Sequence, residues 1–165
     1  AGYYTIPAAA MVGEHGQVYA VDILKSSLQD IQGKAKIEGL RNIQYVWADL
    51  EIKGSTKIPD DSVDVVFLAH IVNQSTAHPS ILEEARRIIK PEGAIVVVEW
   101  KKIKIPFGPP LEKRVAQEEA VKVAGQVGLR LAQDFSAGNY HYGLVFKKSQ
   151  YETPMGPDVK KTDSL

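Results

Sequence analysis

The sequence contains no cysteine, and this absence removes several kinds of site. Without thiols the chain forms no disulfide, offers no thiolate nucleophile and builds no cysteine-rich zinc site. An excess of charge of one sign is also missing, because 20 basic and 20 acidic residues cancel. A chain with no net charge has no overall field that attracts nucleic acid or an anionic membrane, so we expect neither as a partner.

Long apolar runs are absent as well. No run approaches the ~18 residues of a membrane-spanning helix, and no signal peptide is visible. We therefore expect a cytoplasmic protein. No HExxH or comparable spacing occurs, so we expect no metal site. The 165 residues, of which 44% are hydrophobic, suffice for one domain with a sizeable core. We expect this domain over residues 1–148, followed by a polar tail over residues 149–165.

Apolar periodicity predicts helices that alternate with buried strands. Helices are expected over Thr5–Val12, from Ser26 or Ser27, from Pro79 to a stop at Pro91-Glu92-Gly93, and over 116–127. Strands are expected over Val18–Val21, Ile43–Ala48, Val63–Ala69, Ala94–Val98, Leu129–Phe135 and Tyr140–Phe146. Only four residues join the last two strands, too few for a parallel crossover. The pattern predicts an α/β fold: a Rossmann-like, doubly wound, mostly parallel sheet with an antiparallel C-terminal strand.

Acidic and small residues follow three of the predicted strands. Asp22 ends the first of them, twenty positions after Gly2, a spacing at which a carboxylate can accept hydrogen bonds from ribose hydroxyls. Asp49 ends the next strand, where a second acid could contact an adenine amino group. The following strand ends in Ala69 and His70. Since ligands bind at the carboxyl ends of such strands, these residues predict a nucleotide site. The alternative is that Gly2 and Asp22 only cap a turn and a helix.

With these residues in place, the sequence resembles a class I S-adenosylmethionine-dependent methyltransferase of the small-molecule branch (methyltransferase type 11), which includes enzymes of ubiquinone and menaquinone biosynthesis. The matching segments cover nearly everything up to Lys148, and the most specific run extends from Pro59 to Trp100. They are AGYYTIPAA, VYAVDI, ADLE, IPDDSVDVVFLAH, ILEEARRIIKPEGAIVVVEWKK, PFGPPLEKR, GLRLAQDF and YHYGLVFKK.

The resemblance implies S-adenosylmethionine as the cofactor and assigns residues to its parts. Gly2 would close the glycine-rich loop around the methionine part, and Asp22, with Ile23 beside it, would hold the ribose. Asp49 and Leu50 would contact the adenine, and Ala69 with His70 would lie near the sulfonium. The family's first strand and its acidic G-x-G-x-G loop should come before Ala1, and only the last glycine is present. We therefore expect an N-terminally incomplete domain that binds the cofactor poorly by itself.

Methyl transfer needs a base only when the acceptor carries a proton. His70 is the candidate catalytic residue, although a structural histidine lining the pocket would look the same. His141 faces one side of the last strand and could reach an acceptor. The segment IPFGPP, with Tyr140 and Tyr142, predicts a pocket for a small, partly apolar methyl acceptor.

Two other classes stay open. A nicotinamide-dependent reductase would share the spacing from Gly2 to Asp22, although the sequence has no Tyr-x-x-x-Lys pair. A non-catalytic, methyltransferase-like interaction domain would also fit a chain that lacks the glycine-rich loop. The sequence of an upstream peptide would separate the enzyme from the interaction domain. A homo-oligomer is a possible further partner.

Overall fold

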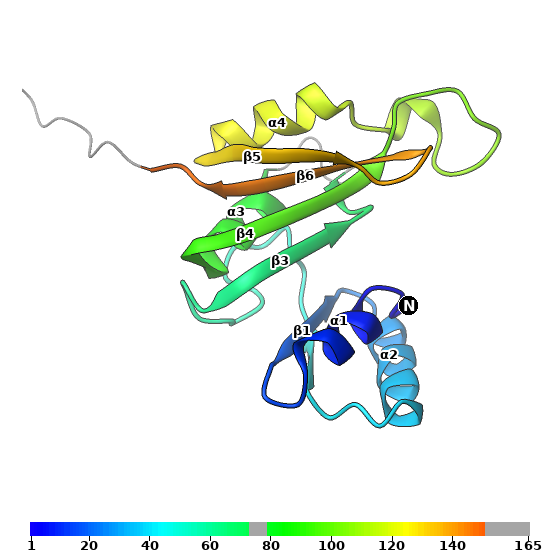
Figure 1. Ribbon diagram of the computed structural model, residues 1–165, viewed down its shortest axis with the longest axis vertical. Coiled ribbons are helices and arrows are strands. Elements are labelled where there is room, and N and C mark those ends of the chain that lie inside the picture. The colour runs from blue at the N-terminus through cyan, green and yellow to red at the C-terminus, as the bar shows by residue number, and fades with distance from the viewer. Residues whose placement is uncertain (73–78, 151–165) are drawn as a thin grey trace, which may run out of the picture.

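A computed structural model describes residues 1–72 and 79–150 of the chain. Helices and strands alternate through most of it (Figure 1). In chain order they are α1 (Thr5–Val12), β1 (Val18–Asp22), α2 (Lys25–Ile37), β2 (Ile43–Trp47), β3 (Val63–Ala69), α3 (Ser80–Ile88), β4 (Ile89–Trp100), the 3₁₀ helix η2 (Leu111–Lys113), α4 (Gln117–Gln126), β5 (Leu129–Ser136) and β6 (His141–Lys148). The α/β class predicted from the sequence is confirmed.

The strands form two sheets. β1 and β2 pair in parallel, and the larger sheet has the order β3-β4-β6-β5. β3 and β4 are parallel, whereas β6 runs antiparallel to both of its neighbours, β4 and β5. The predicted antiparallel last strand is therefore confirmed. Because β6 is antiparallel to β4, its first residue, His141, pairs with Trp100, the last residue of β4. Both residues therefore lie at one edge of the sheet.

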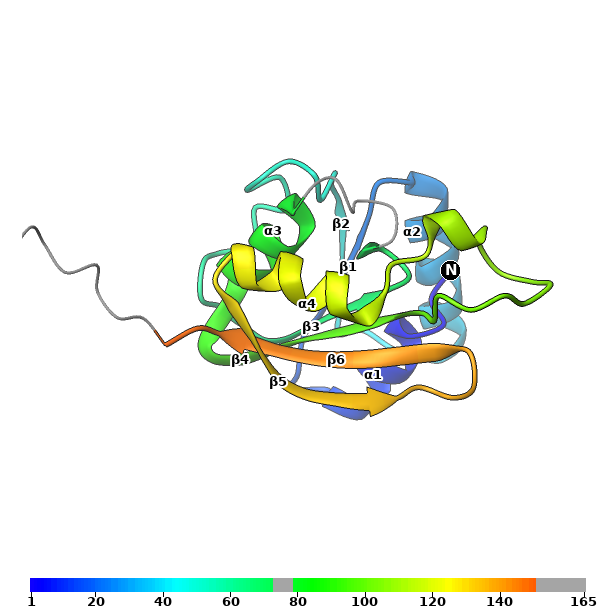
Figure 2. The same ribbon diagram turned by 90° about the horizontal axis from the view of Figure 1, so that it is seen from above.

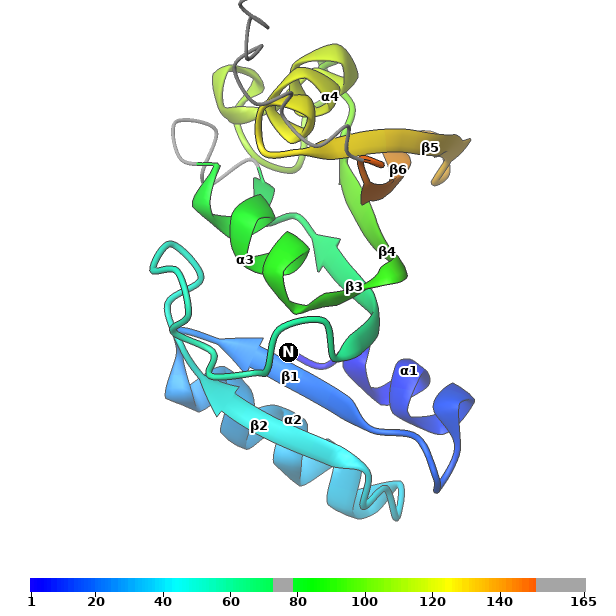
Figure 3. The ribbon, with the colours of Figure 1, turned by 90° about the vertical axis from the view of Figure 1, so that its left-hand side faces the viewer.

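The edges of β1 and β3 that face each other have no strand between them within the described part of the chain (Figure 3). The Tyr4 ring lies 4.8 Å from that of Phe67 and links the N-terminal segment to β3. Val65 is 55% exposed and Phe67 is 42% exposed. The prediction that β3 is covered on both faces is wrong for this face, because both side chains stay exposed even with Tyr4 against Phe67.

The larger core lies on one face of the four-stranded sheet, under α3 and α4 (Figure 2). On β6 it takes in every second side chain, among them Tyr142, Leu144 and Phe146, as the alternation of a strand requires. A smaller core joins α1 and α2 to β1 through Ile6, Ile31 and Ala20. Burying each large apolar side chain contributes roughly 1.5–3 kcal/mol.

Helix α3 ends earlier than the sequence predicts. The expected stop was at residues 91–93, but β4 already begins at Ile89. A proline biases the residue before it toward extended backbone, which ends the helix ahead of the proline. Pairing with β3 then passes from Ile89 to Ala94, so the residues between them form a bulge. Gly93 lies in the bulge, where a Cβ atom would be only 2.8 Å from the carbonyl oxygen of Asp64.

A buried carboxylate ties the segment after β2 to α3. Glu84 is 1% exposed, and the Thr56 hydroxyl donates a hydrogen bond to its Oε1 at 2.7 Å. The Gly54 N–H donates to Oε2 at 2.8 Å, and Arg87 donates to both oxygens at 2.7 and 2.9 Å. Burial alone would raise the pKa of Glu84, but the hydrogen bonds from Arg87, Gly54 and Thr56 outweigh it and lower the pKa to about 2.

Candidate functional site

Two acids lie at the carboxyl ends of β1 and β2. Oδ1 of Asp22 accepts a hydrogen bond from the Leu24 N–H at 2.8 Å, and Oδ1 of Asp49 accepts one from the Glu51 N–H at 2.9 Å. The Asp22 bond closes a turn ahead of α2, whose N-cap residue Leu24 has no side-chain cap hydrogen bond, so Asp22 does not cap the helix as the alternative interpretation expects. Each acid uses one carboxylate oxygen in its local turn. The second oxygen remains able to accept hydrogen bonds from a ligand.

Apolar side chains surround these acids without being covered. Ile23 and Trp47 are exposed, and the Trp47 indole N–H donates a hydrogen bond to the Ile23 carbonyl at 2.8 Å. The Lys25 ammonium lies 4.0 Å from the centre of the Trp47 ring. Leu50 is partly buried against the larger core. Apolar surface beside free hydrogen-bond acceptors is the combination that a nucleoside needs, because its base is flat and its ribose carries hydroxyls.

His70 follows β3 directly and has unusual backbone geometry. Its φ is +58°, in the left-handed region that is uncommon for residues other than glycine. Its backbone N–H donates to the Val98 carbonyl at 2.9 Å, which fixes the strand end. The His70 ring lies 4.9 Å from the His141 ring and 5.7 Å from the Trp100 ring, measured between centroids. Three elements, β3, β4 and β6, therefore bring one aromatic cluster to this edge.

Tyr142 does not belong to this cluster, and its prediction as a pocket residue is wrong. Successive side chains of a strand point to opposite faces, so His141 and Tyr142 cannot line the same pocket. Tyr142 is buried in the larger core, and its hydroxyl donates to the Val115 carbonyl at 3.0 Å. Tyr140 stays on the site side, where its ring lies 4.9 Å from that of Phe107.

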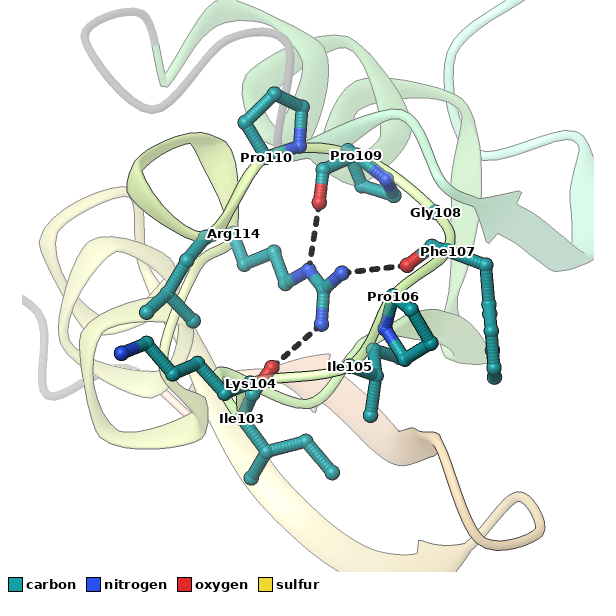
Figure 4. A pocket seen from close by; sticks show the side chains of 10 residues that line it. Ile103, Lys104, Ile105, Pro106, Phe107, Gly108, Pro109, Pro110 and Arg114 are labelled. Carbon is teal, nitrogen blue, oxygen red and sulfur yellow. Dashed lines mark hydrogen bonds between the residues drawn. The ribbon is translucent and has the colours of Figure 1, made fainter.

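The loop of residues 101–110, here called the wall loop, closes around a buried arginine (Figure 4). Arg114 is 3% exposed, and its guanidinium lies 5.5 Å from the centre of the Trp100 ring. It donates hydrogen bonds to the carbonyl oxygens of Ile103 (2.7 Å), Phe107 (2.8 Å) and Pro109 (2.8 Å). The loop and Arg114 line a cavity of about 220 Å³. Carbonyl oxygens carry no formal charge, so these hydrogen bonds do not neutralise the positive charge of Arg114.

This charge acts on the histidines. Burial is the main cause that lowers the pKa of His141, and the positive charges of Arg114 and Lys101 lower it further. The pKa of His70 is lowered by burial and then by its neighbour His141. Both shifts favour the uncharged imidazole, which is the form that can accept a proton.

Gly2 lies apart from the two histidines, against α2. Its φ of +84° is in the left-handed region that favours glycine, and a Cβ atom there would lie 3.4 Å from Ile31. The Lys34 ammonium donates to the Ala1 carbonyl at 2.6 Å and holds this segment on the helix. Gly2 is therefore a well-defined turn residue, and its assignment to the cofactor stays a prediction.

Other sequence-based candidates are less informative. Asn73 and Gln74, which follow His70 and could contact an acceptor, lie outside the described residues, as does His78, for which the sequence predicts no role. Within residues 1–72 and 79–150, no group of three His, Cys, Asp or Glu side chains could hold a metal ion. None of the described helices is both long and apolar enough to cross a membrane. Arg114 was not among the residues predicted for the site, and in the sequence only its place in the segment PFGPPLEKR points to it.

Comparisons with known proteins identify the family of this chain. Residues 1–148 match the model of a methyltransferase domain family. A ubiquinone/menaquinone biosynthesis C-methyltransferase of Shewanella frigidimarina is 28% identical over 142 residues, which cover 86% of this chain and 53% of that protein. The chain thus spans about half the length of this curated relative. Nothing in these matches favours the nicotinamide-dependent reductase.

Solved structures show the same fold. An S-adenosylmethionine-dependent methyltransferase from Aquifex aeolicus superposes with a TM-score of 0.80 and 28% identity, covering 88% of this chain and 76% of that one. A type 11 methyltransferase from Sulfolobus solfataricus gives a TM-score of 0.71 at 22% identity over 88% of this chain and 79% of its own. With the family model matched over residues 1–148, the chain belongs to the family of S-adenosylmethionine-dependent methyltransferase domains.

Proposed function

We propose that the carboxyl edge of the two sheets carries out S-adenosylmethionine-dependent methyl transfer to a small-molecule acceptor. Two observations support the proposal: Asp22 and Asp49 each keep one carboxylate oxygen outside their local turn at the ends of β1 and β2, and an aromatic cluster with two histidines lies at the ends of β3 and β4. The acids suit the nucleoside part of the cofactor. The cluster suits the acceptor.

The residues at the ends of β1 and β2 fit the adenosine part. The free oxygen of Asp22 would accept hydrogen bonds from the ribose hydroxyls, and the exposed Ile23 side chain would pack beside the base. Asp49 and Leu50 would contact the adenine from the next strand. Ala69, with its small side chain, would leave room near the sulfonium. When bound, the cofactor supplies a methyl group on a sulfur that leaves as a neutral thioether.

The methionine part has fewer partners in the described chain. Gly2 is the residue assigned to it, and it packs against α2. The facing free edges of β1 and β3 support the expectation that one more parallel strand, with its glycine-rich loop, belongs between them. We therefore expect the 165 residues by themselves to bind the cofactor toward the weak end of the usual range.

On the acceptor side, the chain supplies aromatic side chains that would align the methyl acceptor and a histidine that can accept its proton. Trp100, Phe107 and Tyr140 form consecutive ring contacts, with centroids 6.2 and 4.9 Å apart. Phe107 and Tyr140 are exposed, so these rings offer an apolar surface that would orient a small, partly apolar molecule. A nucleic acid would instead need a series of phosphate contacts. Lys101, Lys102 and Lys104 are too few and too isolated to provide them.

Transfer of a labelled methyl group tests the proposal. The protein would be incubated with methyl-labelled cofactor and separate pools of metabolites, lipid extract and RNA. Label in a small organic fraction is the expected result. Label mainly in RNA, with transfer lost between low and moderate salt, would refute a small-molecule acceptor. If no pool is labelled and the cofactor does not bind, the non-catalytic interaction domain becomes the better interpretation.

A further inference from the structure

The strongest unexplained feature of the described chain is the pair formed by His70 and His141. His70 stands at the end of β3 and His141 at the start of β6, so the pair depends on β6 running backwards beside β4. The His141 ring also lies 4.1 Å from the Trp100 ring. Two imidazoles and an indole therefore share one small volume at the edge of the sheet.

Each of the two histidines has one energetically unfavourable feature. The left-handed backbone of His70 is strained for a residue that is not glycine, and such strain tends to collect at functional sites. Nε2 of His141 is shut off from solvent and has no hydrogen-bond partner among the described residues. An enclosed nitrogen without a partner costs about 1–3 kcal/mol. Because buried polar side-chain atoms are usually hydrogen-bonded, the enclosed Nε2 of His141 calls for an explanation.

The surroundings of Nε2 indicate where the proton of the neutral ring sits. The Trp100 and His70 ring centroids lie 4.1 and 4.9 Å from that of His141, and an enclosed nitrogen next to aromatic rings is more favourable as an N–H than as a bare lone pair. Nε2 should therefore carry the hydrogen. Nδ1 then keeps its lone pair, and because the His141 residue is only partly buried, this nitrogen can face a ligand.

Charged and titratable groups around His141 come from four directions. His70 follows β3, Lys101 follows β4, Arg114 precedes α4, and Tyr140 lies in the turn before β6. Two of these carry fixed positive charge. They disfavour protonation of His141 in the resting protein, and they would stabilise negative charge that develops on an acceptor as it loses its proton.

We propose that Nδ1 of His141, with its ring oriented by His70 and Trp100, takes the proton from the methyl acceptor; this rests on the proposed methyl transfer. The acceptor atom forms its bond to the methyl carbon as the carbon–sulfur bond breaks, and the electron pair of that bond stays on sulfur. The acceptor's proton passes to Nδ1. His141 is thus the catalytic residue, and His70, the candidate from the sequence, is a positioning residue.

The first test reads the protonation state directly. Trp47→Phe leaves Trp100 as the single tryptophan of the chain, and a charged imidazole at 4.1 Å quenches its emission. Emission should fall in one step at a pH below the ordinary histidine midpoint of 6.5. Lys101→Met should move this step to higher pH, because one of the two cations is gone. Lys102→Met, which changes an exposed neighbour, is the matched control and should not move it.

Two further variants assign the step. His141→Gln should abolish it, whereas His70→Gln should keep it and alter its midpoint. Nitrogen-15 spectra of the histidine rings should show hydrogen on Nε2 of His141 at neutral pH. A step that survives His141→Gln, or a His141 ring with its hydrogen on Nδ1 or charged at neutral pH, would overturn the proposal.

The second test follows a proton without any cofactor. 4-Nitrophenol is a small aromatic acid whose ionised form is yellow. Added at a pH near its own midpoint, it should become more yellow on binding to the parent and to Lys102→Met, because His141 accepts its proton while Lys101 and Arg114 stabilise the phenolate. His141→Gln should bind it with a clearly smaller gain of colour. Equal colour with the parent and His141→Gln, or no colour with either, would contradict the role of His141. Because cofactor binding is measured separately, failure of this inference and failure of the proposed methyl transfer are distinguishable.

Discussion

Glu84→Gln is the substitution whose effect follows most directly from the contacts of the structure. The carboxylate is buried and accepts four hydrogen bonds, from Arg87 (two), Thr56 and Gly54. Glutamine has the same shape, but its NH₂ group would face donors instead of accepting from them. Arg87 would also lose its buried counter-charge. Breaking a buried pair by removing one partner costs about 3–5 kcal/mol of the free energy of unfolding.

The pKa of Glu84 gives an independent magnitude. It falls from 4.5 to about 2, and each unit is worth about 1.4 kcal/mol, so the charged form contributes about 3 kcal/mol. Because the folded-state pKa is lowered, this stability is present above pH 4.5 and is lost as the pH falls toward 2. The two values overlap at about 3 kcal/mol, which is the loss of unfolding free energy that we expect for Glu84→Gln at neutral pH. The loss should be smaller in acid.

Urea unfolding at neutral pH and in acid measures this difference. Glu83→Gln is the matched control, since Glu83 is an exposed neighbour on the same helix, and its unfolding free energy should stay within about 0.5 kcal/mol of the parent. A neutral-pH difference for Glu84→Gln as small as that of the control would refute the reasoning. So would a difference that does not shrink as the pH falls.

Two further stability predictions follow from single contacts. Tyr142→Phe should lower the free energy of unfolding by about 1–2 kcal/mol in urea titrations, because the Val115 carbonyl loses its buried hydroxyl donor, whereas Tyr140→Phe should change it little. Gly143→Ala should destabilise the protein by about 1–3 kcal/mol, because the new methyl would collide with the Phe135 ring. Gly33→Ala, in α2 with no atom within 4 Å of the new Cβ, should instead raise the thermal midpoint. An equal response of the two glycine positions would contradict the packing described for β6.

The regular elements could be predicted from the sequence because their signals are local. Helix α1 and strand β3 have the predicted bounds, since each is an almost continuously apolar run with polar or turn residues at its ends. The antiparallel direction of β6 followed from a four-residue connection. The positions of Asp22 and Asp49 at one edge followed from the parallel pairing of the strands that they end.

The acceptor side could not be predicted in the same way, because it depends on strand order and loop backbone. That β6 lies between β4 and β5 is what brings His141 to His70, and no local pattern encodes it. The same alternation of faces sends Tyr142 into the core. Arg114 donates its hydrogen bonds to main-chain carbonyls. Every residue has such a carbonyl, so the sequence does not indicate which residues Arg114 contacts.

Calorimetric titration with S-adenosylmethionine tests the central claim, that the acids at the ends of β1 and β2 hold the cofactor. The account predicts binding between millimolar and micromolar affinity, about −4 to −8 kcal/mol, toward the millimolar end for these 165 residues. Asp22→Ala should weaken it by roughly 1–3 kcal/mol, through loss of a charged acceptor for the ribose hydroxyls. Asp30→Ala, at an exposed acid of α2, should leave it unchanged. Equal affinities for the parent and Asp22→Ala would contradict the account.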